Sequence, residues 1–324
     1  ERGAQGDAAS AGARNPLWWA VSAFATPKVA LVTLGVWLVL LGVGTVESRK
    51  LLTGDVGAGV PELRAESRYN QDNDRIVSSY SIGMDVLSVY AETEGEGEAC
   101  LRWPVMNAVE RFDLHMRGVD GVQSVVTAAT LAKVAAGGNN EANPRWAALQ
   151  RSEAALRTGS RTLNPLKGLN DDGCKVIHLV IYLNDHQGAT LKHVVGEVQK
   201  FIDAEKTPGI TFRLAGGNAG VAAATNEAVE KAEVEMLGAI FGAIIVLCWL
   251  TFRSWKAVLC IMVPLTIVAI MCNALMAWLG IGLKVPTLPT LPVIALGVGV
   301  GVDYGIYLYE RMQHEFDDKG SSLR

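Results

Sequence analysis

The stretch GVGVGVDYGIYLY, residues 297–309, places a single acid, Asp303, inside an otherwise uncharged run. This run extends from Leu288 to Tyr309 and is long enough for a helix to cross a bilayer. A carboxylate at such a depth is energetically costly, and it usually marks an ion or substrate pathway. The stretch therefore predicts a membrane-spanning helix in which Asp303 has a functional role.

Glycines recur at every fourth position of this stretch, at Gly297, Gly301 and Gly305. On a helix, residues with this spacing form one stripe, which the backbone of another helix can approach closely. At about 100° per residue, Asp303 lies almost opposite the stripe, and Tyr307 shares its face. We therefore expect helix packing on one face and proton chemistry on the other.

A proton relay is the favoured role of this acid, because a low-dielectric environment disfavours the ionised form. Protonation would switch a helix contact between two states, and Tyr304 and Tyr307 could hydrogen-bond the carboxylate or line its water path. Two other interpretations stay open. Asp303 could merely bond a neighbouring helix, or it could belong to an intramembrane aspartyl protease. Proteolysis would need a second facing carboxylate, which the other apolar runs lack, so we do not expect an enzyme.

Three further uncharged stretches are candidate spans, at Val29–Val46, Met236–Phe252 and Ala257–Ile281. Four such runs argue against buried core helices of a soluble protein. The first run is too long for the apolar part of a signal peptide, so we expect an uncleaved anchor. The expected fold class is thus an α-helical transmembrane bundle of four spans.

Basic residues in short flanks predict the orientation, since positive charge is retained on the cytoplasmic side. If the spans alternate, these residues all fall on one side: Arg14, Lys28, Arg253, Lys256 and Arg311. The predicted boundaries are a cytoplasmic or interfacial segment 1–28, spans 29–46, 236–252, 257–281 and 288–309, an extracytoplasmic domain 47–235 and a cytoplasmic segment 310–324.

Residues 47–235 are too many for a structureless loop and predict a folded domain. A strand-helix-strand pattern occurs in it twice, which is typical of an α+β ferredoxin-like sandwich. Gly137–Asn140 suggests a mobile insertion between the two units, and Ala222–Glu235 should continue as a helix into the second span. The predicted strands are Met84–Glu92, Gly121–Val126, Lys175–Leu183 and Ile210–Leu214, and the predicted helices are Trp103–Arg117, Trp146–Arg157 and Ala189–Lys206.

The five cysteines divide between the spans and the outer domain. Cys100 and Cys174 each directly precede one element of the two units, and we hypothesise a disulfide between them that closes a long loop. Two free buried thiols are the alternative. The histidines show no metal-ligand spacing, so we expect no metal. The net charge of −4 argues against a protein that coats nucleic acid.

Taken together, one span, a large outer domain, three close spans and the run GVGVDYGIYLYER resemble one half of a resistance-nodulation-division (RND) permease. The resemblance is strongest to MMPL-type predicted exporters, to which GDVGAGVPELRAESRYNQD, residues 54–72, is also similar. It implies that Asp303 and Tyr304 belong to a proton relay and that the domain is a porter domain. The run before the first span, Asn15–Trp18, favours the C-terminal half. No basic residue lies inside the four spans, so a cationic relay partner would belong to the other half.

The resemblance implies export of hydrophobic or lipid-like molecules, driven by the proton-motive force, across or out of the bacterial inner membrane. The domain would be periplasmic, and protons would be the coupling ion, with no other cofactor. Expected partners are membrane lipids, the cargo, the remaining half of the same permease and another copy in a homo-oligomer, but no nucleic acid. The alternative is a sterol-sensing-like receptor, or a proton-driven auxiliary of protein export without small-molecule cargo.

Overall fold

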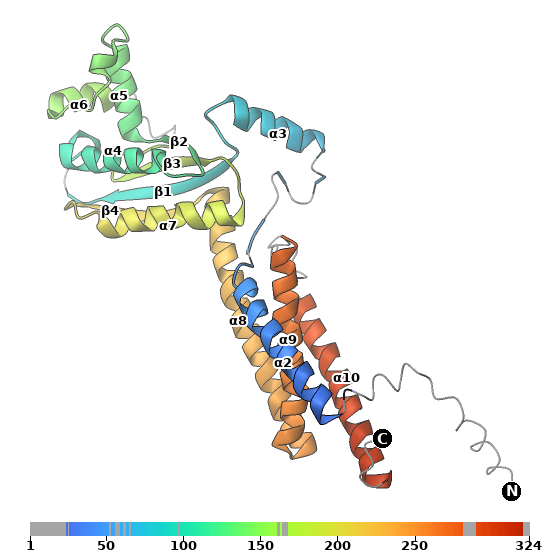
Figure 1. Ribbon diagram of the computed structural model, residues 1–324. Coiled ribbons are helices and arrows are strands. Elements are labelled where there is room, and N and C mark those ends of the chain that lie inside the picture. The colour runs from blue at the N-terminus through green and yellow to red at the C-terminus, as the bar shows by residue number, and fades with distance from the viewer. Residues whose placement is uncertain are drawn as a thin grey trace. The chain divides into compact units, whose positions relative to one another are not determined.

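The computed structural model describes residues 24, 26–51, 53–55, 59–60, 63–64, 66–95, 97–160, 163, 168–280 and 290–319. In the last of these stretches, side chains are described for residues 297–314 only. Contacts divide the chain into a helical unit and a second unit, chiefly Leu52–Ala232, that contains a sheet. The labels of Figure 1 are used for all elements.

The helical unit contains α2 (Pro27–Ser48), the C-terminal part of α8 (Gly217–Phe252), α9 (Trp255–Trp278) and α10 (Thr290–Lys319). Among the described residues, α2, α8 and α9 are long and apolar enough to cross a membrane. Large apolar side chains on these helices are exposed, as Leu31 is at 77%. Exposure on this scale is unfavourable in water but suits helices that face lipid.

The predicted fourth span falls within α10 from Thr290 onward. Its first residues, 288 and 289, lie outside the described residues, as do the link 282–287, residues 1–23 of the N-terminal segment and residues 320–324. The helix continues to Lys319, ten residues beyond the predicted end at Tyr309. A membrane crossing by α10 remains a prediction.

Helix α9 lies at the centre of the helical packing, in contact with α2 and with α10. On the α2 side, a side chain at Gly44 would lie 3.0 Å from Met271 Sδ, so the glycine allows the two helices to approach closely. Hydroxyl groups within the apolar helices bond to their own backbone. Thr33 donates to Val29 O at 2.8 Å, and Thr266 donates to Met262 O at 2.9 Å. These bonds satisfy the hydroxyls without water.

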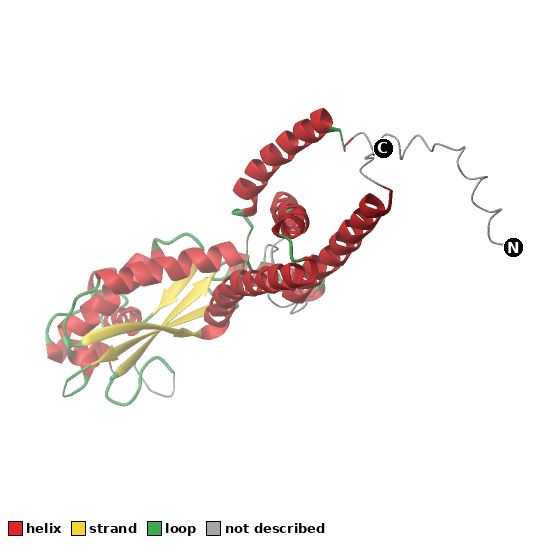
Figure 2. Ribbon diagram, turned by 90° about the horizontal axis from the view of Figure 1, so that it is seen from below, coloured by secondary structure: helices red, strands yellow, loops and turns green. Residues whose placement is uncertain are grey.

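The second unit is built on one antiparallel sheet in the order β2-β3-β1-β4, which Figure 2 shows as a single layer. Helices α4 and α7 each connect two of its strands, as in a split βαβ sandwich. The strands are β1 (Asp85–Thr93), β2 (Val122–Val126), β3 (Val176–Leu183) and β4 (Ile210–Gly216), and the helices are α4 (Trp103–Arg117) and α7 (Gly188–Ala204).

One face of the sheet carries the core of this unit. Alternate residues of β3, from Ile177 to Leu183, are fully buried, as the two-residue period of a strand requires. The rings of Phe112 in α4, Phe201 in α7 and Phe212 in β4 lie 5.2–5.5 Å from one another. Both helices therefore cover the same face.

Three helical segments differ from the sequence prediction. The predicted helix Trp146–Arg157 is wrong as a continuous element. A 3₁₀ turn, η3 (Pro144–Trp146), ends at Trp146, and α6 (Glu153–Ser160) begins only after Ser152, whose hydroxyl accepts from Ala155 N. Of the predicted insertion Gly137–Asn140, the two glycines end a helix that was not predicted, α5 (Ala128–Gly138), and Asn139 caps it. Helix α3 (Arg68–Ser79) was also not predicted. A short 3₁₀ turn, η2 (Ala99–Leu101), precedes α4.

Helix α8 joins two predicted segments, Ala222–Glu235 and Met236–Phe252, without interruption. It begins directly after β4, at Gly217, where φ is +80°. A side chain at this position would collide with the Val86 carbonyl. Glycine is thus required for both the turn and the close approach.

Candidate functional site

The glycine stripe of α10 packs against α9 at two of its three positions. A Cβ atom at Gly301 would lie 2.9 Å from Leu265 Cδ1, and one at Gly305 would lie 3.2 Å from Ile261 Cγ2. At Gly297 nothing described lies within 4 Å. The sequence prediction of a packing stripe therefore corresponds to a real contact at Gly301 and Gly305.

Apolar residues between the glycines complete this interface. Val298 and Val302 are 5% and 7% exposed and belong to a cluster with Cys248 of α8. Tyr309 packs edge-on against Phe252, with ring centroids 5.1 Å apart. Helix α10 is thus held along this face by α8 and α9.

The predicted relay residues lie on the other face of α10. Asp303, Tyr304 and Tyr307 are all exposed, the two tyrosines at 73% and 69%. Among the described residues, the Asp303 carboxylate has no hydrogen bond or ion pair, and neither tyrosine bonds to it. The structure therefore brings the three residues onto one helix face, where no described residue pairs with the acid.

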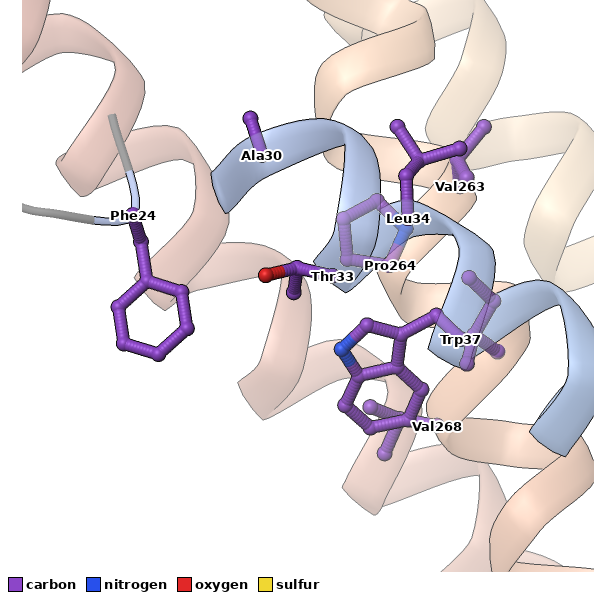
Figure 3. Close-up of a pocket in the computed structure, with 9 residues that line it drawn as sticks. Phe24, Ala30, Thr33, Leu34, Trp37, Val263, Pro264 and Val268 are labelled. Carbon is purple, nitrogen blue, oxygen red and sulfur yellow. The ribbon is translucent and has the colours of Figure 1, made fainter. Parts of the chain in front are cut away.

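An apolar cavity of about 420 Å³ lies between α2 and α9. Figure 3 shows the Trp37 indole reaching from α2 toward Val268 of α9. The Thr33 hydroxyl in its wall is already bonded to the helix backbone. The cavity is lined by Phe24, Ala30, Thr33, Leu34, Trp37, Val263, Pro264, Ile267 and Val268.

Two further cavities adjoin α9. One, of about 360 Å³, continues along α2 and shares Leu34, Trp37, Val263 and Ile267 with the first. The other, of about 290 Å³, runs along the glycine stripe on the α10 side and shares Pro264 and Val268. These cavities could not be predicted from the sequence, because side-chain gaps depend on how helices pack and not on the apolar pattern of any one helix.

In the second unit, Cys100 and Cys174 form a disulfide with their Cα atoms 5.6 Å apart. Both are almost completely buried, at 1% and 6% exposure. The cysteines of the helical unit, Cys248, Cys260 and Cys272, are free. Across the part of the chain that the structure describes, no three His, Cys, Asp or Glu side chains form a metal-binding group.

Two titratable groups of this unit have shifted acidities. A hydrogen bond to Asp85 raises the pKa of His186 above 6.5, against an opposing effect of burial. Burial acts to raise the pKa of Glu205, but hydrogen bonds from Thr207 and Arg111 outweigh it and lower that pKa. Both groups tie segments of the domain together. Neither group could be singled out from the sequence, because their partners Asp85 and Arg111 are distant in the chain.

Comparison with known proteins identifies one related family. Residues 167–322, just under half of the chain, match the model of the MMPL family. The match begins shortly before β3 and extends through α10, so it includes the Gly301, Asp303 and Tyr304 positions. No curated protein matches the chain.

Proposed function

We propose that the chain is a transporter of the RND superfamily that exports hydrophobic or lipid-like molecules, because its residues 167–322 match the model of the MMPL family. Export would be driven by protons, with Asp303 as the group that binds and releases them. On this proposal the protein is a transporter and not an enzyme.

The observation that carries the proposal is the division of α10 into two faces. Gly301 and Gly305 pack against α9, whereas Asp303 is exposed within an uncharged run on the opposite side. A membrane carboxylate in this position needs a partner or water when it is ionised and becomes tolerable in lipid when it is neutral. Protonation of Asp303 would therefore allow the exposed face of α10 to lie against lipid, whereas the ionised form would need water or a polar partner.

The remaining half of the permease would supply the surface that meets this face. The chain would lie in the bacterial inner membrane, with the sheet-containing unit as a periplasmic porter domain. Membrane potential contributes about 2.3 kcal/mol per charge for each 100 mV. Entry of protons would thus supply a driving force for the movement of cargo.

The cavities beside α9 support a hydrophobic cargo. Their walls are nearly all apolar, and Thr33 keeps its hydroxyl bonded within α2. A polar solute would lose hydrogen bonds to water on entering such a space, whereas an acyl or alkyl chain would lose none. The volume of about 420 Å³ is within the range of small-molecule pockets.

The test is transport by the complete protein in lipid vesicles with an imposed pH gradient. The probe is a long-chain acyl lipid that carries a fluorophore, and a pH-sensitive dye reports proton movement. We expect Asp303→Asn to remove gradient-dependent movement of both the probe and protons. Tyr304→Phe should slow both, because it removes only the hydroxyl.

Asp203→Asn is the matched control, since it removes a carboxylate from the exposed end of α7 and should transport normally. Retention of the Cys100–Cys174 disulfide in each variant reports that the domain is folded. Proton and probe fluxes of Asp303→Asn equal to those of the wild type would contradict the proposal. Proton flux without probe movement in the wild type would instead favour a proton-driven protein that has no lipid cargo.

A further inference from the structure

The segment that connects α2 to α3 is hydrogen-bonded to other parts of the sheet-containing unit at Asp55 and at Val60. Near its start, Gly188 N at the beginning of α7 donates to Asp55 O at 2.9 Å. Near its end, Val60 N donates to the Asn70 side chain of α3 at 2.9 Å. We call residues 53–55 and 59–60 the connecting segment.

His186 lies between this segment and the sheet. It precedes α7, and its Nδ1 is 3.2 Å from Asp85 Oδ2 at the start of β1. The two side chains are only 18% and 15% exposed. Asn218 of α8 fixes the acid from the other side, donating from Nδ2 to Asp85 Oδ1 at 3.1 Å. The histidine thus meets a carboxylate that is already held in place.

The surroundings of His186 favour its charged form. Asp85 contributes most through its hydrogen bond and its charge, and Asp55 and the Gly59 backbone of the connecting segment contribute in the same direction. Within its own loop, Asp185 accepts from Gln187 N. The group that faces the cluster from α8, Asn218, is uncharged. Two carboxylates from different segments therefore favour the charged imidazole, Asp85 through a hydrogen bond and Asp55 through its charge.

Burial of the second ring nitrogen acts against the charged form of His186. His186 Nε2 is inaccessible and unpaired among the described residues. The attraction of Asp85 and Asp55 outweighs this cost in the charged ring, and a neutral ring would lose that attraction. The contact between histidine and connecting segment consequently depends on charge.

We propose that charged His186 is a pH-dependent latch that holds the connecting segment against the start of β1 and α7. The latch is closed at acidic pH and opens as the imidazole loses its proton. Opening removes the positive charge of His186 that attracts Asp55 and loosens the segment that follows α2 in the chain. This inference does not depend on transport.

The direction of the effect follows from the raised pKa of His186. The folded domain binds this proton more tightly than the unfolded chain does, so the stabilisation is complete below about pH 6.5. It is lost as the pH rises through the higher pKa of the folded state. The connecting segment should therefore be most firmly held on the acidic side.

The test is hydrogen exchange of the complete protein in detergent, measured from pH 5.5 to 9 and corrected for the intrinsic pH dependence of exchange. The reporter is the Gly188 amide, whose acceptor is Asp55 O. We expect its exchange to accelerate by about five- to tenfold at alkaline pH, as for loss of a charge-assisted hydrogen bond. His186→Gln should exchange at the fast rate throughout, without the pH step.

His193→Gln is the matched control, because His193 lies exposed on α7 and the step should survive its replacement. Protection of β3 amides reports whether each variant is folded. In the wild type, NMR titration should give the His186 ring a midpoint above the ordinary value of 6.5. An unchanged pH step in folded His186→Gln, or a His186 midpoint below 6.5, would overturn the proposal.

Discussion

Glu205 links two elements of the sheet-containing unit through one carboxylate. Its Oε1 accepts from Thr207 N at 2.9 Å, and its Oε2 accepts from Arg111 of α4 at 2.7 Å. The side chain is only 9% exposed. We expect Glu205→Gln to lower the free energy of unfolding by about 1–3 kcal/mol, because hydrogen bonds to a buried charge are lost. The change is measured by unfolding the protein in denaturant, with hydrogen exchange of the β4 amides as the reporter.

The effect of this substitution should depend on pH in a defined direction. The pKa of Glu205 is lowered on folding, so its stabilisation is present above about pH 4.5 and is lost as the pH falls through the folded-state value. The difference between wild type and Glu205→Gln should therefore shrink in acid. Glu153→Gln is a control, since its pair with Arg157 is exposed and should contribute little at any pH. A pH-independent difference would refute this assignment.

At the scale of elements, the contact between α9 and α10 depends on the absence of a side chain. We expect Gly301→Leu to destabilise the helical unit by about 1–3 kcal/mol, because the new side chain overlaps Leu265. Gly297→Leu adds the same side chain where nothing described lies within 4 Å and should be tolerated. Thermal denaturation in detergent compares the two variants.

A second substitution tests the cause of that loss. Leu265→Ala removes the side chain that Gly301→Leu would meet, so the double variant should recover part of the stability. Equal destabilisation by Gly297→Leu and Gly301→Leu would instead indicate a general intolerance of bulk in α10. The double-variant comparison distinguishes the two explanations.

Elements with a strong periodic pattern could be predicted from the sequence, and elements without one could not. The helix Trp103–Arg117 was predicted with its observed bounds, since Pro104 at its first turn and a regular apolar face mark it. Helix α3 has no apolar face of that kind and depends on Ser67, whose hydroxyl accepts from Asn70 N. Helix α5 is rich in alanine and glycine, which give no clear period. A capping residue such as Ser67 can be recognised only once the position of the helix end is known.

The candidate site divides in the same way. The separation of Asp303 from Gly301 and Gly305 follows from helix geometry alone and could be predicted. The His186–Asp85 contact could not, because 101 residues separate the two in the chain and only the sheet brings them together. Contacts between distant segments need the fold itself.

At the scale of the whole molecule, two kinds of stabilisation operate in one chain. The helical unit has few buried side chains and exposes large apolar surfaces, so its stability depends on a surrounding membrane. The sheet-containing unit has a closed apolar core around Phe112 and a disulfide. A change that removes only the membrane, or only the disulfide, should therefore destabilise only the unit that depends on it.

Reduction of the Cys100–Cys174 bond is such a condition. The two cysteines are 74 residues apart and enclose α4, β2, α5 and α6 within the loop that they close. The cross-link restricts the unfolded chain and thereby adds about 4 kcal/mol to the free energy of unfolding by the loop-entropy argument.

We expect Cys100→Ala with Cys174→Ala to lower the denaturant midpoint of the sheet-containing unit markedly, as reductant should for the wild type. Cys260→Ala, which removes a free thiol of α9, should leave that midpoint unchanged. Since both sulfurs are buried, a reductant should act slowly on the folded protein, and rapid reduction without unfolding would contradict this account.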